Sequence, residues 1–103
     1  MKGSIYIDEN IIGGADFQII DESMGVIGGV LIPNASYMKY ENLIQGHYQQ
    51  KGVANSEDFN FKIVLNDAIL EPEGGISITD SDEFDEVYVE AAGLSLEILN
   101  NLK

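Results

Sequence analysis

The chain has 103 residues, of which 45% are hydrophobic, and it carries a formal net charge of −13. This length fits a single domain spanning residues 1–103, and the apolar content is sufficient for a hydrophobic core, so the acidity does not indicate disorder. The chain has five lysines, no arginine and no cysteine, which argues against direct binding to nucleic-acid phosphates or anionic membranes and excludes disulfides and thiolate chemistry.

The N-terminal residues lack the pattern of a secretion signal, because no apolar stretch precedes Asp8 and Glu9. The longest apolar-rich run, residues 26–32, is too short to span a bilayer. We therefore expect a cytoplasmic protein.

The first half of the chain predicts three strands. Residues 5–7 form a short first strand, and residues 17–21 and 26–32 form a hairpin around a four-residue turn. Gly28 and Gly29 inside the second hairpin strand predict a bulge or a close backbone approach.

From residue 36 to residue 50 the hydrophobic period changes. Tyr37, Tyr40, Ile44 and His47 are spaced as one stripe of an amphipathic helix, and Gly52 is a natural stop for it. His47 is the only histidine, and on this stripe we expect it at the edge of the core rather than in a catalytic role.

The second half returns to strand patterning. Residues 59–66 alternate between apolar and polar side chains, as do residues 76–79 and 86–91, and the last two runs form a second hairpin. In that hairpin Val87, Val89 and Ala91 face the core and Tyr88 faces outward. Residues 94–102 fit a strand or a helix. The fold class that follows is α+β, a mainly antiparallel sheet of about five to seven strands with one amphipathic helix packed on it.

Motifs for catalysis or cofactors are lacking in the sequence. There is no nucleophile elbow, and the paired glycines are not followed by the residues of a phosphate-binding loop. A calcium loop beginning at Asp80 would need an oxygen ligand, a glycine and a glutamate where the chain has Phe84, Asp85 and Ala91. We expect no enzyme activity, no cofactor and no metal site.

The most distinctive feature is an acidic strip. Residues 71–90 contain eight carboxylates and no lysine. Complementary charge speeds the association of proteins, and tyrosine is favoured where binding energy concentrates. The predicted partner-binding residues are therefore Asp80, Asp82, Glu83, Phe84, Asp85, Glu86, Tyr88 and Glu90.

In overall character the chain resembles the immunity proteins of bacterial toxin–immunity pairs, including those of contact-dependent growth inhibition. The resemblance lies in small size, strong acidity, and the lack of cysteine and of catalytic motifs. It implies an antitoxin that binds a basic toxin domain, of the nuclease kind, and blocks it. Two other functions remain open: a structural or adaptor module whose acidity serves only solubility, and a nucleic-acid mimic.

Overall fold

The computed structural model describes residues 1–51, 54–55, 59–80 and 86–102. In chain order the elements are β1 (Lys2–Ile7), β2 (Asn10–Asp16), β3 (Gln18–Asp21), β4 (Val26–Pro33), the 3-10 helix η1 (Ala35–Lys39), α1 (Glu41–Lys51), β5 (Ala54–Asn55), β6 (Phe61–Leu65), β7 (Ala68–Ile69), β8 (Gly75–Asp80), β9 (Val87–Ala92) and α2 (Leu96–Leu102). The fold class is α+β, as predicted. Seven strands have four or more residues, and β5 and β7 have two each.

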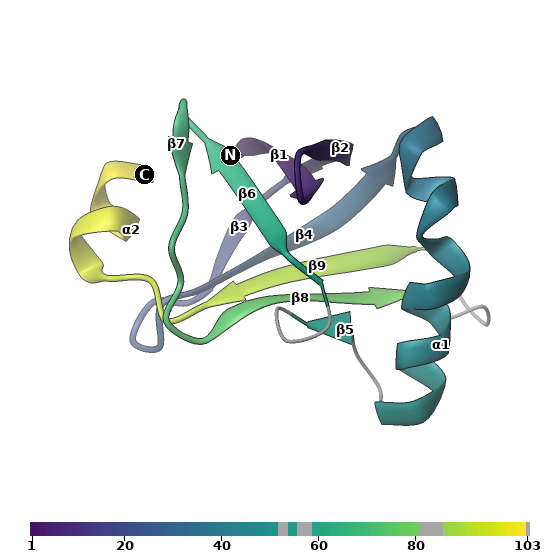
Figure 1. Ribbon diagram of the computed structural model, residues 1–103. Coiled ribbons are helices and arrows are strands. Elements are labelled where there is room, and N and C mark those ends of the chain that lie inside the picture. The colour runs from purple at the N-terminus through teal and green to yellow at the C-terminus, as the bar shows by residue number, and fades with distance from the viewer. Residues whose placement is uncertain (52–53, 56–58, 81–85, 103) are drawn as a thin grey trace.

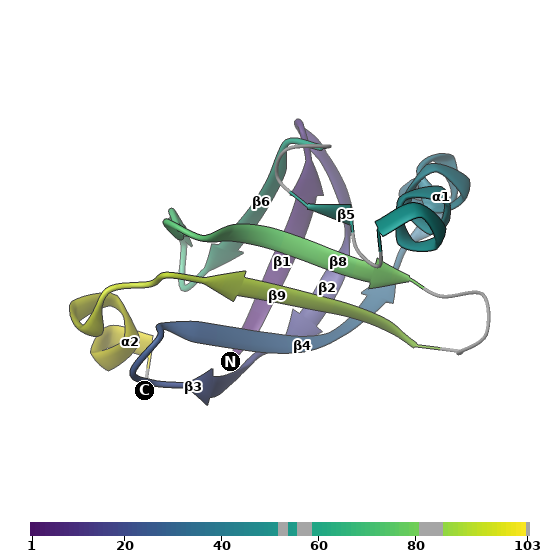
Figure 2. The ribbon, with the colours of Figure 1, turned by 90° about the horizontal axis from the view of Figure 1, so that it is seen from below.

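The strands form one curled antiparallel sheet. Their order is β5-β8-β9-β4-β2-β1-β6-β7, and β3 pairs with β4 outside this path. The curl brings β1 and β6 across β8 and β9 at a steep angle, whereas α1 and α2 lie near opposite ends of the long strands (Figures 1 and 2). The concave inner face holds the core, and we call the opposite side of the sheet the outer face.

The core is built from alternate residues of the strands. Ile5, Ile27, Ile63, Ile78 and Val89 come from five different strands, and each is fully buried. The alternation of buried and half-buried residues along β6 and β8 follows the period of two predicted from the sequence. Burial of these aliphatic side chains is the main source of the stability of the sheet.

Both predicted hairpins are confirmed. β3 pairs with β4, and β8 pairs with β9, in antiparallel register. Gly25 in the first turn has a φ of 66°, a conformation that glycine adopts without strain. A Cβ atom there would overlap the carbonyl oxygen of Leu94, so this turn also packs tightly against the chain that leads into α2.

β2 is a strand that the sequence pattern does not predict. It pairs with both β1 and β4. The register between β1 and β2 shifts beside Ile5 and Tyr6, and paired glycines interrupt the strand. Side-chain alternation is lost at such irregularities, so the hydrophobic period that identifies a strand is absent.

The predicted helix forms in two parts. η1 and α1 are separated by Tyr40, and the side chain of Asn34 accepts a hydrogen bond from the backbone N–H of Ser36 at 2.9 Å, which caps the first part. Tyr37 and Ile44 are buried, as the stripe predicts. α1 packs against β8 and β5. The predicted stop at Gly52 lies outside the described residues.

The open assignment of residues 94–102 is settled in favour of a helix. The hydroxyl of Ser95 accepts a hydrogen bond from the backbone N–H of Ile98 at 3.3 Å at the start of α2. Leu94 and Leu99 are buried, and together they fasten this segment to the core.

Candidate partner-binding surface

The predicted site residues have different locations. Asp82, Glu83, Phe84 and Asp85 lie outside the described residues. The remaining four are Asp80 at the end of β8, Glu86 just before β9, and Tyr88 and Glu90 within β9.

Asp80 does not belong to an exposed binding surface, so its prediction as a contact residue is wrong. Only 4% of its surface is exposed. The hydroxyl of Tyr37 donates a hydrogen bond to its Oδ2 atom at 2.5 Å, and the side-chain amide of Gln45 donates to Oδ1 at 3.3 Å. A buried carboxylate needs such donors, so Asp80 ties η1 and α1 to the end of β8.

The same contact changes the chemistry of Tyr37. Burial first, and then the hydrogen bond to Asp80 and its negative charge, raise the pKa of the Tyr37 hydroxyl far above its ordinary value. Tyr37 therefore remains a protonated donor at every physiological pH.

The outer face of the sheet carries Glu86, Tyr88 and Glu90, as predicted. Val89 and Ala91 are fully buried, and in a strand the residues that alternate with buried ones face the other way. Glu86 is exposed, and Tyr88 and Glu90 are half-exposed. This part of the predicted surface is accessible to a partner.

The ring of Tyr88 lies over the sheet and is not extended into solvent. A Cβ atom on Gly28 would lie 2.5 Å from the Tyr88 hydroxyl oxygen and 2.5 Å from Cδ1 of Ile20, so both side chains occupy the space above this glycine. Burial, and to a lesser degree the charge of Glu90, raise the pKa of the Tyr88 hydroxyl. The hydroxyl is thus a neutral hydrogen-bond donor beside an apolar surface.

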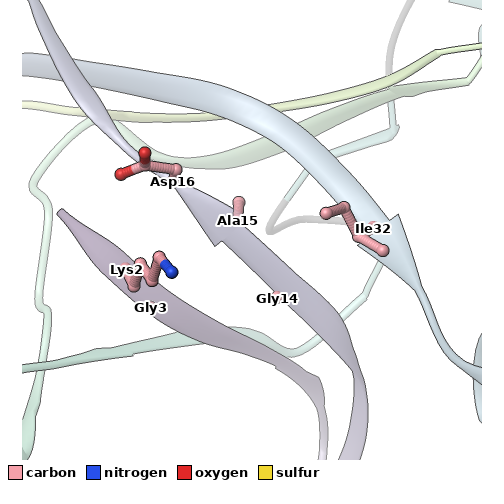
Figure 3. Close-up of a pocket in the computed structure, with 6 residues that line it drawn as sticks. All are labelled: Lys2, Gly3, Gly14, Ala15, Asp16 and Ile32. Carbon is pink, nitrogen blue, oxygen red and sulfur yellow. The ribbon is translucent and has the colours of Figure 1, made fainter.

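A groove runs along the outer face from Tyr88. One hollow of about 410 Å³ is lined by residues that include Ile20, Gly28, Val30 and Tyr88. The neighbouring hollow of about 390 Å³ lies over β1, β2 and β4 (Figure 3). The two hollows share lining residues and form one surface, which we call the outer groove.

Asp16 and Ile32 line both hollows and connect them. Gly14 lies opposite Ile32 in the β2–β4 register, and Lys2 lies opposite Asp16 in the β1–β2 register. The glycines leave the floor low, and Ile32 is 74% exposed above it. The arrangement is an open, mainly apolar surface, whose polar side chains are Lys2, Asp16, Gln18 and Tyr88, and it suits docking of a polypeptide.

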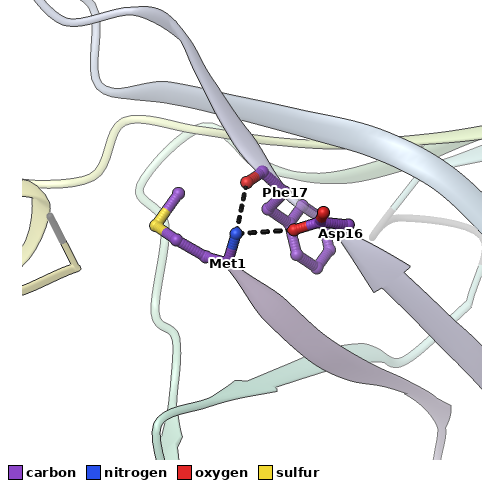
Figure 4. A network of polar contacts seen from close by, with 3 residues as sticks. All are labelled: Met1, Asp16 and Phe17. Atoms are coloured by element: carbon purple, nitrogen blue, oxygen red, sulfur yellow. Dashed lines mark hydrogen bonds and ion pairs between the residues drawn. The ribbon is translucent and has the colours of Figure 1, made fainter.

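The Lys2 end of the outer groove carries a small excess of positive charge, because the Met1 ammonium and Lys2 lie near the single carboxylate of Asp16. The N-terminal ammonium of Met1 donates to the carboxylate of Asp16 at 2.6 Å and to the carbonyl oxygen of Phe17 at 2.9 Å (Figure 4). The hydrogen bond and charge of this ammonium, and to a smaller extent the charge of Lys2, lower the pKa of Asp16. The unbalanced carboxylates lie at the opposite end, beside Tyr88.

His47 lies where the helical stripe places it, at the edge of the core. Its ring meets that of Phe59 edge-to-face, with 5.4 Å between the ring centroids. This contact gives His47 a role in packing, because aromatic pairs of this geometry stabilise the folded state.

Among the residues that the structure describes, no three His, Asp or Glu side chains are grouped so that they could hold a metal ion. Within the same part of the chain, no helix has the length and apolar character needed to cross a membrane. Comparison with protein-family models, curated proteins and solved structures found no match to this chain.

The sequence pattern predicts the outward position of Tyr88 but does not identify the outer groove. A signal for it was present, because β4 is apolar at nearly every position and does not alternate with polar residues. Such a strand is typical of sheets covered on both faces.

Proposed function

We propose that the protein is an immunity protein: it binds a basic cognate toxin domain, of nuclease type, in the cytoplasm and neutralises it. The observation that carries the proposal is the outer face of β9, where Tyr88 lies between Glu86 and Glu90 and is accessible. Nuclease domains are basic because they hold phosphates. A mixed aromatic and acidic surface complements them in charge and contributes an anchor residue.

The wider charge distribution supports the same function. Residues 53–103 hold twelve acids and two lysines, so the half of the chain that contains β9 is strongly negative. Such a charge attracts a cationic partner over long distances and raises the association rate by orders of magnitude. It also repels nucleic acid, and we therefore propose a protein partner.

The test begins with recovery of the partner by affinity purification from native cells, followed by measurement of its nuclease activity with and without this protein. We expect one-to-one inhibition. The association rate should fall steeply between about 0.05 M and about 0.5 M salt. Added salt shortens the distance over which charges act, from roughly 10 Å or more to a few ångströms. If the association rate does not change with salt, the acidic residues serve only solubility, and the proposal is refuted.

A matched pair of variants locates the field. The double variant Glu86→Gln and Glu90→Gln removes two charges on either side of Tyr88 at nearly constant shape, whereas Glu73→Gln with Glu97→Gln removes two exposed charges elsewhere. We expect the β9 pair to slow association several-fold more than the control pair, because steering depends on the position of charge as well as on its sum. Equal effects would show that β9 is not the docking face.

A further inference from the structure

The outer face of β4 is apolar although it is exposed. Val30 is 40% exposed and Ile32 is 74% exposed, and both point away from the core. β4 is an interior strand, with β9 on one side and β2 and β3 on the other. In an antiparallel sheet with one face in water, the outward positions of such a strand are ordinarily polar. Exposed apolar surfaces of this kind mark interaction sites.

Neighbouring strands extend this apolar surface. Ile20 on β3 is 50% exposed, and its tip and the Tyr88 hydroxyl both lie above Gly28. Across the strand pair, Val30 lies directly opposite Tyr88. The groove therefore has an aliphatic floor with one aromatic side chain at its acidic end, Asp16 where the two hollows meet, and Lys2 at its other end.

The charges around the groove select its occupant. Glu86 and Glu90 flank Tyr88 on the outer face, and Glu90 lies opposite Gly28 in the β9–β4 register. A second copy of this chain would carry its own charge of −13 to the same surface, and this repulsion opposes pairing of two copies. An apolar segment with Lys or Arg near β9 would complement both the apolar floor of the groove and the acidic side chains of Glu86 and Glu90.

We infer that the outer groove is the docking site for a segment of the partner in which aliphatic or aromatic residues are flanked by Lys or Arg. The apolar side chains cover Val30 and Ile32, and the cationic side chains lie over Glu86 and Glu90. This inference rests on the proposed function, and it assigns the binding energy to β4 while the acids of β9 steer association and fix the orientation.

The experiment uses a phage library of random peptides as the probe. Selection is carried out on the full chain and, in parallel, on the double variant Val30→Thr and Ile32→Thr, which keeps β-branched residues in the strand while removing the apolar surface. The control is Ile69→Thr, another exposed strand isoleucine, 62% exposed and outside the groove. Thermal melts of all proteins confirm that each variant folds.

We expect peptides that combine apolar residues with Lys or Arg, that bind the double variant about tenfold more weakly than the wild type, and that bind the control variant normally. NMR shift changes should centre on β4 and β9. Basic peptides that bind the wild type and the double variant equally would overturn the inference but leave the acidic docking surface of the proposed function intact.

Two other outcomes would also overturn it. Peptides that need the apolar surface but carry no basic residues would contradict the charge argument here and in the proposed function. A dimer detected by sedimentation, and dissolved by the Val30→Thr and Ile32→Thr substitutions, would assign the groove to a second copy of the chain.

Discussion

Two adjacent glycines in β4 offer a sharp test of the sheet geometry, because their missing side chains would point to opposite faces. A Cβ atom on Gly29 would lie 2.6 Å from the backbone carbonyl oxygen of Asp16. On Gly28 the nearest atoms, at 2.5 Å, are the tips of the Ile20 and Tyr88 side chains. Backbone cannot yield without moving a strand, whereas the tip of a side chain can rotate.

The magnitudes follow from these contacts. Ordinary van der Waals contact begins at 3.4 Å, so in Gly29→Ala the two strands must separate by roughly 0.8 Å, the difference from 2.6 Å. Overpacking of this kind costs about 1–3 kcal/mol, and replacing glycine by alanine within a strand returns roughly 0.5–1 kcal/mol. We expect Gly29→Ala to lower the free energy of unfolding by about 1–2 kcal/mol, or the Tm by roughly 5–15 °C.

Gly28→Ala provides the matched control. Alanine is more favourable than glycine within a strand, and this gain offsets the cost of displacing the two side-chain tips. The free energy of unfolding of Gly28→Ala should therefore stay within about 1 kcal/mol of the wild type. Urea titrations of both variants measure the midpoint and the slope, and an unchanged slope shows that the denatured state is the same. If Gly28→Ala is the more destabilising of the two, the assignment of faces along β4 is wrong.

Three further predictions concern the β9 hairpin strand, the buried Tyr37 and the aromatic contact of His47. Val89→Asp should unfold the domain, because an unpaired charge would replace a fully buried side chain, whereas Tyr88→Ala should change the thermal melt little. Because burial and then Asp80 raise the pKa of Tyr37, the folded state keeps a proton that the unfolded chain loses above the ordinary value of 10.0. The free energy of unfolding should therefore fall as pH rises past about 10, and Tyr37→Phe should make this fall shallower in urea titrations at several pH values. His47→Gln should lower stability by about 1 kcal/mol, as an aromatic contact is lost, and leave partner affinity within about threefold.

Local pattern predicts most of this fold. The alternation at Phe61, Ile63 and Leu65 identifies β6, because a half-buried strand imposes a period of two on its residues. The same reasoning places Val89 inside and Tyr88 outside. These features depend on neighbours in sequence, so the sequence alone reveals them.

Features that depend on distant residues are not predictable in this way. Asp80 belongs by composition to the acidic strip. In the structure it is buried and accepts a hydrogen bond from Tyr37, which lies 43 positions earlier in the chain. The position of the Tyr88 ring depends on Gly28, which is its neighbour only because β4 pairs with β9. No local period encodes such partners.

The acidity and the apolar outer face have a common physical consequence. An interior strand that exposes Val30 and Ile32 would favour association between copies of the chain, since exposed apolar patches are covered by whatever surface is available. A net charge of −13 on every copy opposes that association and opposes binding to any other acidic protein, while it favours a cationic partner. On this argument the charge provides selectivity and the apolar groove provides affinity. Neutralising acids far from β9 should therefore promote self-association before it weakens partner binding.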